Sequence, residues 1–381
     1  MDSRTLFESE FSTRFNCSHA FSFWKARVAL YAILRGLGIG SGDEVILPGY
    51  TCVMDVNPIK YVGAKPVYAD IEPNTFNMAP ARVEEQITPR TKLIIAQHTY
   101  GYPCDMDRIL DLAQRHHVSV IEDCCLSLGS TYKGKLVGTF GKAAYFSFQW
   151  NKPFTTGLGG MAITNDAQLA DTIAALCRER LVQPSVKDVL MLSAQLAVYR
   201  AFIYPRTTAL AQTIFRTLTK KGLVVGSSST AEFVPTMAPD FFKWMSGVQA
   251  RSGLRQLKKL TSGIEHRKRM ALLYETLLSE IGVQPVQYDA GVYDPVLVRY
   301  PVRVKDKDRA LHDAASAGVE LGSWFECPLH PIETPLAAYD YTPGMCPEAE
   351  RASGEVVNLP LHPRAGEATA RRTVNFIQKY V

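Results

Sequence analysis

Residues 146–160 read FSFQWNKPFTTGLGG, an aromatic run that leads to Lys152 and then to a glycine-rich turn. The apolar residues from Ala143 to Phe148 predict a buried strand, so Lys152 follows directly on its carboxyl end. In general, desolvation disfavours an ammonium group and frees an amine that can attack carbonyls. The same stretch also fits a lysine that merely ends a strand, one of 42 Lys and Arg residues. Other parts of the chain have to decide between these interpretations.

The segments before this stretch alternate between short apolar runs and helical patterns. Apolar residues spaced three and four apart predict a helix over 25–37. Further strands are predicted at 44–47, 65–71, 92–98 and 118–123, with helices at 55–62, 80–86 and 106–116; the MAITND stretch (161–166) continues the pattern. This alternation is typical of an α/β fold with a mainly parallel sheet between helices.

The carboxyl ends of such strands are where ligands bind in open α/β sheets. By this prediction Thr51, His98, Asp123 and Lys152 all lie at that edge. Asp123 has three interpretations: a metal ligand, a helix cap, or the partner of a cationic ring nitrogen. The eight histidines include no HxH or HxxxH pair, so no metal site is predicted. Lys25, Ala26 and Arg27 open the first of these helices, where free N–H groups and basic side chains favour a phosphate or a solvated surface turn.

The totals describe an ordinary globular chain of 381 residues, 46% hydrophobic and 21% charged, with a net charge of +5. Its basic residues are scattered, so nucleic acid is not an expected partner. The eight cysteines form no CxxC pair, and the Cys124–Cys125 pair lies in an apolar run, which favours reduced thiols and a cytoplasmic location. We expect neither a signal peptide nor a membrane span.

The second half of the chain has a different organisation. Apolar helical runs within 184–237 predict a helical insert or subunit contact, with a membrane-surface contact as the alternative. A long amphipathic helix, an alternating strand at 296–304 and a final helix predict a smaller α+β unit. We place the boundary near residue 250, with a large domain at 1–250 and a small C-terminal domain at 251–381.

A set of ordered motifs carries a family resemblance over about 25–180 and 244–381. The chain resembles the DegT/DnrJ/StrS family of sugar aminotransferases, which use pyridoxal 5'-phosphate (PLP) and have the aspartate aminotransferase-like fold type I. The motifs are GDEVILPGYT (42–51), GAKPVYADIEPNTFN (63–77), ITPRTKLIIAQHTYGYPCDMDRI (87–109), VIEDCC (120–125), YKGKLVGTFGKAAYFSFQWNK (132–152), GGMAITND (159–166), MSGVQA (245–250), CPEAE (346–350) and LPLHP (359–363).

The resemblance implies a role for each matching residue. Lys152 falls at the lysine that forms the internal aldimine and acts as general acid and base, and Asp123 at the acid that holds the pyridine nitrogen. Ala26, Arg27 and Ser147 fall at phosphate-binding positions. Cys52 stands where the family often stacks an aromatic ring on PLP, with Tyr50 two residues away. Three further departures are Leu126, Phe242 and Trp244, where the family usually has Gln, Asn and Arg.

The implied reaction moves an amino group from an amino acid, usually glutamate, to a keto sugar, usually nucleotide-linked, in a homodimer. One alternative is a PLP-dependent sugar dehydratase, although dehydratases that resemble this scaffold have His at the lysine position. The other alternative is a non-catalytic regulatory or membrane-associated member of the family.

Overall fold

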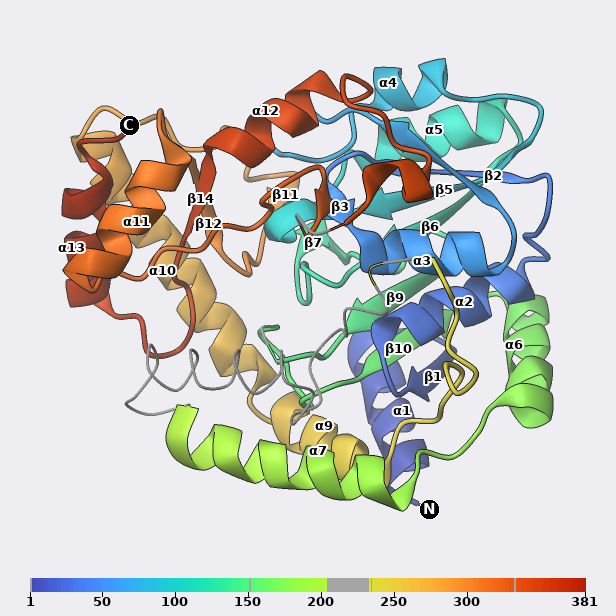
Figure 1. The fold of residues 1–381 in the computed structure, drawn as a ribbon. Coiled ribbons are helices and arrows are strands. Elements are labelled where there is room, and N and C mark those ends of the chain that lie inside the picture. Colours follow the sequence, from blue (N-terminus) through green and yellow to red (C-terminus); the bar gives the residue numbers. More distant parts are fainter. Residues whose placement is uncertain (1, 151, 204–232, 234, 332–333) are drawn as a thin grey trace.

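A seven-stranded sheet forms the centre of the computed structural model, which describes residues 2–150, 152–203, 233, 235–331 and 334–381 (Figure 1). Its strand order is β1-β10-β9-β6-β5-β2-β4. These strands span His19–Phe23 (β1), Glu44–Pro48 (β2), Lys65–Ala69 (β4), Thr91–Gln97 (β5), Ser119–Asp123 (β6), Ala143–Ser147 (β9) and Gly160–Thr164 (β10). Each predicted strand of the first half lies within a residue or two of one of these.

The sheet is parallel across its middle and antiparallel at one edge. Strands β4, β2, β5, β6 and β9 run parallel in that order, as predicted. Strand β10 instead pairs antiparallel with β9, and β1 pairs antiparallel with β10. The strand predicted at 161–166 is present as β10 and is followed by a helix, but it runs antiparallel to its neighbour β9. The described residues of the connection from β9 to β10 form no helix, and a parallel crossover needs one or an equally long connection.

Helices cover both faces of the sheet because its strands are apolar on both sides. One face of the strands, including Val45 and Ile121, packs against α2 (Ala26–Gly36), α3 (Val53–Tyr61) and α6 (Ala167–Arg180). The opposite face, including Ile46 and Val120, packs against α4 (Pro80–Glu85) and α5 (Met106–Arg115). The N-terminal residues, which the sequence left unassigned, form α1 (Ser3–Phe15) and β1.

The described C-terminal part contains five longer helices and several short strands. The helices are α9 (Gly247–Leu257), α10 (Leu260–Glu280), α11 (Lys307–Ala317), α12 (Pro347–Glu355) and α13 (Glu367–Ile377). Its short strands are β11 (Tyr293–Asp294), β12 (Tyr300–Arg303), β13 (Leu329–His330) and β14 (Val356–Leu359), and η4 (Leu336–Tyr339) is a short helical turn. The first half adds the short strands β3 (Thr51–Cys52), β7 (Thr131–Tyr132) and β8 (Lys135–Leu136) and the turn η1 (Thr99–Gly101). The boundary at residue 250 stays a prediction; α9 spans it and packs against α1.

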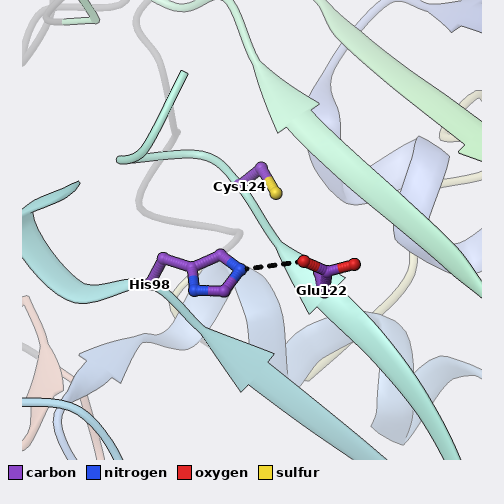
Figure 2. Close-up of side chains that lie close together, drawn as sticks. All are labelled: His98, Glu122 and Cys124. Atoms are coloured by element: carbon purple, nitrogen blue, oxygen red, sulfur yellow. Dashed lines mark hydrogen bonds and ion pairs between the residues drawn. The ribbon is translucent and has the colours of Figure 1, made fainter. Parts of the chain in front are cut away.

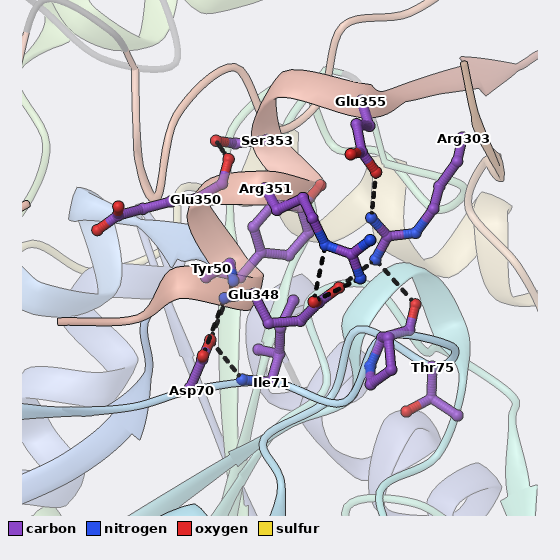
Figure 3. Close-up of polar contacts among 12 residues, drawn as sticks. Tyr50, Asp70, Ile71, Thr75, Arg303, Glu348, Glu350, Arg351, Ser353 and Glu355 are labelled. Atoms are coloured by element: carbon purple, nitrogen blue, oxygen red, sulfur yellow. Dashed lines mark hydrogen bonds and ion pairs between the residues drawn. The ribbon is translucent and has the colours of Figure 1, made fainter. Parts of the chain in front are cut away.

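Polar contacts join α12 to the end of strand β4 (Figure 3). The Asp70 carboxylate accepts hydrogen bonds from the backbone N–H groups of Glu348 and Ala349, both at 2.9 Å, in the first turn of α12. Arg303 forms ion pairs with Glu348 at 2.5 Å and with Glu355 at 2.6 Å. A carboxylate at a helix N-terminus is stabilised by the N–H groups and by the helix dipole. These contacts hold the C-terminal part against the large sheet.

The predicted insert at 184–237 lies partly outside the described residues, because 204–232 and 234 are not described. Its described part contains α7 (Val186–Val198) and the π-helical turn η2 (Tyr199–Ile203). Val186, Leu190 and Val198 of α7 are exposed, whereas Leu192 and Leu196 are buried. Within the described ranges, no helix is long and apolar enough to cross a membrane.

Candidate active site

One cavity lies at the carboxyl ends of the parallel strands and collects most of the sequence-predicted residues. Its lining draws on the start of α2, the β3–α3 segment, the ends of β6 and β9, the loop after β9, and one residue of the C-terminal part. The lining residues are Lys25, Ala26, Arg27, Cys52, Met54, Asp55, Cys125, Ser147, Gln149, Lys152, Leu158, Gly159 and Trp324.

Backbone and side-chain hydrogen bonds fix the loop that carries Lys152. The Lys152 N–H donates to the carbonyl of Gln149 at 3.0 Å. Further along, the buried Gln249 amide of α9 donates to the carbonyl oxygens of Leu158 at 2.9 Å and of Trp24 at 3.2 Å. Since Trp24 immediately precedes the start of α2, one side chain ties the lysine loop to the predicted phosphate-binding turn.

The start of α2 is open to the cavity. Its N-cap residue is Lys25, and no side chain caps the helix there. Gly160 of β10 packs so closely that a Cβ atom at this position would lie 2.3 Å from the Ala26 Cα. The first turn therefore lies directly against the sheet, near Ser147. Uncapped N–H groups, the helix dipole and the basic side chains of Lys25 and Arg27 together favour an anion.

Two carboxyl groups lie at the strand end of the cavity. Asp123 is the last residue of β6 and is 3% exposed, and its carboxylate accepts the N–H of Cys125 at 2.8 Å. Oxygen atoms of Asp123 and Asp55 and the sulfur of Cys125 all lie within 4.8 Å of one another. Burial, together with the Asp123 charge, raises the pKa of Asp55 to about 8. The sequence prediction did not include Asp55.

The walls of the cavity carry thiols and one indole. Burial raises the pKa of the Cys52 thiol to about 12 and the pKa of Cys125 well above its usual value, so both are neutral. Tyr50, the aromatic residue near Cys52 in sequence, is fully buried and shares a hydrogen bond with Tyr100 at 2.8 Å away from the lining. Trp324 provides the aromatic surface instead, with the Lys152 Nζ 4.8 Å from its ring centroid. No local sequence signal pointed to Trp324, which is 172 residues from Lys152.

His98 lies outside the cavity, although the sequence placed it at the same edge. Its Nδ1 accepts the N–H of Cys104 at 2.9 Å, so Nε2 carries the hydrogen and contacts Glu122 at 3.1 Å (Figure 2). Side chains alternate along a strand, so Glu122 projects from the face of β6 opposite to Asp123. The Glu122 carboxylate also accepts three backbone N–H groups, from Gly138, Phe140 and Gly141, at 2.6–2.8 Å.

Two side-chain groups of the described chain have the composition of metal sites: His98, Glu122 and Cys124, and Asp55, Asp123 and Cys125. In the first, hydrogen bonds engage both ring nitrogens of His98 and both Glu122 oxygens. In both, burial raises the pKa of the cysteine thiol well above its usual range, and metal ligation requires the thiolate. These donors do not favour a metal ion.

The cavity fits PLP at both ends. An uncapped helix start with two basic side chains suits the phosphate group, and a pair of carboxyl groups suits the ring nitrogen. Lys152 lines the same cavity and supplies the amine.

Comparison with known proteins gives the family. The model of the DegT/DnrJ/EryC1/StrS aminotransferase family matches residues 2–191 and 208–378. The chain belongs to this family. It is 33% identical to GDP-perosamine synthase of Caulobacter vibrioides, over 97% of this chain and 87% of that protein. It is 30% identical to L-glutamine:2-deoxy-scyllo-inosose aminotransferase of Micromonospora echinospora, over 79% of this chain and 64% of that protein. Among solved structures, S. venezuelae DesV in complex with a ketimine intermediate has a TM-score of 0.77 at 26% identity, over 100% of this chain and 89% of that one.

The family and the fold confirm three predictions: the fold type, the aminotransferase class and the PLP cofactor. The roles assigned to individual residues stay predictions, although Lys152, Ala26, Arg27, Cys52 and Ser147 do share one cavity with Asp123 beside it.

Proposed function

We propose that this protein transfers an amino group from glutamate to a nucleotide-linked keto sugar, with Lys152 as the catalytic lysine. The observation that carries the proposal is the convergence of Lys152, the acid pair and the open start of α2 on one cavity. When bound, PLP supplies an aldehyde for the amine and an electron-withdrawing ring that stabilises a carbanion. The residues of the chain then have to bind, orient and move protons.

Each residue has a physical task in this proposal. The first turn of α2 and Ser147 bind the phosphate group and thereby fix the ring in the cavity. Asp123 keeps the ring nitrogen protonated, because a nearby negative charge favours the positive form of its partner. Lys152 carries the proton to and from the reacting carbon as general acid and base. Its fixed loop keeps the amine at the required place.

Sugar chemistry is supported by the relatives. GDP-perosamine synthase is named for a nucleotide sugar, and UDP-N-acetyl-3-dehydro-alpha-D-glucosamine 3-aminotransferase of Acidithiobacillus ferrooxidans is named for another. Trp324 offers an apolar ring surface at the cavity, which suits packing against the C–H face of a sugar. The Micromonospora relative is named for glutamine, so glutamine is the second donor to test.

The first test locates the covalent link. The PLP-loaded protein is reduced with borohydride and its peptides are mapped by mass spectrometry; we expect the pyridoxyl label on Lys152. Lys25 is a matched control, because it is the other lysine that lines the cavity. Lys25→Ala should keep the label and Lys152→Ala should lose it. Label on Lys25 in the wild-type protein would contradict the assignment.

The second test follows the two half-reactions. Glutamate or glutamine is added to the loaded protein, and the visible absorbance is expected to change as the amino group is transferred to the cofactor. Keto sugars with different nucleotides are then offered, and return of the original spectrum identifies the acceptor. No spectral change with any amino donor would contradict an aminotransferase. A deoxygenated, unaminated sugar product would instead identify the dehydratase alternative.

A homodimer and a cytoplasmic location are part of the same proposal, since the family resemblance implies the first and reduced cysteines favour the second. Sedimentation of the purified chain tests the dimer. Vesicle flotation with and without residues 184–237 tests the membrane-associated alternative, which fails if neither form floats.

A further inference from the structure

Asp55 occupies a place in the cavity that the sequence prediction gave to Asp123. It lies in the first turn of α3 and lines the cavity together with Cys125. Asp123 is not among the lining residues of the described chain; it lies beside both of them, with its oxygens within 4.8 Å of the Asp55 oxygens. A group that enters from the cavity therefore meets Asp55 before it meets Asp123.

The hydrogen bonds of Asp55 indicate that one of its oxygens carries a proton. Asp55 Oδ1 accepts the hydroxyl of Tyr145 at 3.1 Å. Asp55 Oδ2 lies 3.4 Å from Thr51 Oγ1, and the same Thr51 oxygen lies 2.5 Å from Gln97 Oε1. A threonine hydroxyl has one hydrogen, and the shorter contact takes it. A hydrogen on Asp55 Oδ2 then satisfies the longer contact.

The orientation of Gln97 supports this assignment. Its Nε2 donates to the carbonyl of Tyr50 at 2.9 Å and to Thr99 Oγ1 at 3.0 Å, so both amide hydrogens are used. Its oxygen therefore faces Thr51 and can only accept. Thr51 must donate to Gln97, and it presents a lone pair to Asp55.

The charges around Asp55 agree with a neutral acid. Burial is the largest cause of the raised pKa of Asp55, and the Asp123 charge adds to it. Lys152, the Tyr145 hydroxyl and Arg27 act in the opposite direction and do not overcome it. The thiols of Cys52 and Cys125 also face the pair and are neutral. A buried carboxyl group and a half-buried one this close together cannot both ionise easily.

A structural role for Asp55 is the simpler interpretation. An acid in the first turn stabilises a helix through the dipole, and Asp55 is the acidic residue in the first turn of α3. That effect needs a charged side chain, however. Asp55 is instead half-buried beside a second acid, which disfavours its charged form and costs stability. A cost of this kind at a cavity wall indicates function.

We propose that Asp55 and Asp123 act as one unit opposite the cofactor ring nitrogen, with a single proton for the two acids, carried by Asp55 at neutral pH, and with Asp55 facing the cavity. Asp55 is then a positioning residue that sets the charge of Asp123. At pH values below the pKa of Asp55 the two acids together carry one negative charge, and at pH values above it they carry two. This inference rests on the proposed function, because it assumes that PLP binds in this cavity.

Infrared titration of the cofactor-free, full-length protein tests the shared proton without reference to the reaction. The wild-type protein should show a protonated carboxyl band at pH 7 that disappears with a midpoint near pH 8. Asp55→Asn should lack this band. Asp123→Asn should shift its midpoint to lower pH, because the like charge is removed. Glu8→Gln is the matched control: Glu8 is a half-buried acid whose pKa desolvation raises, but it lies outside the cavity lining, so the band should stay.

Absence of the band in the wild-type protein would overturn the proposal, and so would an unchanged midpoint in Asp123→Asn. Asp55→Ser provides a second neutral variant if Asp55→Asn does not fold.

PLP affinity tests whether the pair faces the ring. Equilibrium dialysis gives the Kd of wild-type protein and of Asp55→Asn at pH 7 and pH 9. The titration of free PLP cancels in the ratio of the two Kd values. We expect this ratio, variant over wild type, to rise about tenfold from pH 7 to pH 9, because only the wild-type pair gains a charge; one pKa unit corresponds to a factor of ten.

A constant ratio would overturn the proposal even if the infrared band is present. Failure of the proposed function has a different signature: no pyridoxyl label on Lys152 after borohydride reduction. The infrared result then still decides whether the two acids share a proton.

Discussion

Glu122 and Asp123 are neighbours on one strand, yet their surroundings differ in every respect that matters to a buried acid. Glu122 accepts three backbone N–H groups and contacts His98, so each of its oxygens has partners. Asp123 accepts one backbone N–H group and lies beside a second acid, Asp55. The fold stabilises the first carboxylate and places the second in competition with a like charge. Saturated hydrogen bonding identifies a structural acid, whereas a costly acid pair at a cavity identifies a functional one.

The largest expected effect is on stability at Glu122. Glu122→Ala leaves the buried N–H groups of the 138–141 turn without an acceptor, so the free energy of unfolding should fall by about 4 kcal/mol. Urea denaturation of the cofactor-free protein measures this loss. Glu85→Ala is the control, since Glu85 pairs with Arg82 on the surface and should cost less than about 1 kcal/mol. A loss at Glu122 no larger than at Glu85 would remove the distinction between the two neighbours.

Asp123→Asn should reduce activity and leave stability unchanged, unlike Glu122→Ala. We expect kcat/KM to fall by about 10²–10³-fold, because the ring nitrogen loses its charged partner. The cofactor-free protein should not lose stability, since the Asn side-chain oxygen can still accept the Cys125 N–H and Asp55 no longer lies beside a charged acid. Steady-state kinetics and urea denaturation measure both quantities. A loss of stability like that of Glu122→Ala, with activity per folded molecule unchanged, would make Asp123 a second structural acid.

The pH dependence of stability sharpens the contrast further. The folded-state pKa of Asp55 is raised to about 8, above the 3.8 of an ordinary Asp, so the folded chain binds more protons than the unfolded chain between these values. Stability therefore falls as pH rises through this window. Relative to Asp55→Asn, the cofactor-free wild-type protein should lose about 2 kcal/mol between pH 6 and pH 8. Parallel stability curves for the two proteins would show that Asp55 titrates normally.

The smallest expected effect is at His98, the outer partner of Glu122. His98→Gln keeps a polar group at the site but places it at a different distance from Glu122. We expect the free energy of unfolding to fall by about 1–2 kcal/mol. Its effect should be less than additive with Glu122→Ala, because both changes disrupt one network. A double-mutant cycle by urea denaturation gives the coupling. Full additivity would mean that the 3.1 Å contact contributes nothing.

Local patterns in the sequence were enough to predict the parallel strands, α2 and the position of Lys152. These predictions depend on the periodicity of apolar residues and on the ends of strands, and both can be read from residues that are close in sequence. The antiparallel edge was missed, although the loop from 148 to 159 has Pro153, two glycines and no helical spacing, which favours an antiparallel return.

Asp55 and Trp324 were missed for different reasons. Asp55 has the sequence context of an ordinary first-turn acid, and only its contact with Asp123 and Tyr145 distinguishes it. Trp324 reaches the cavity through tertiary packing of the C-terminal part. His98 follows the carboxyl end of β5 as predicted, but it does not line the cavity, because a strand end predicts an edge of the sheet and not the face to which a side chain points.

The pairing of β3 with β13 has a consequence for synthesis of the protein. Thr51 pairs with Leu329 and Cys52 with His330, so the strand beside the cavity obtains its neighbour from a segment nearly three hundred residues later. Trp324 belongs to the same segment of the chain. A nascent chain that has emerged from the ribosome only to residue 300 contains Lys152, Asp55 and Asp123 but lacks this wall. Cofactor capture during translation should therefore come late, after the chain has emerged beyond residue 330.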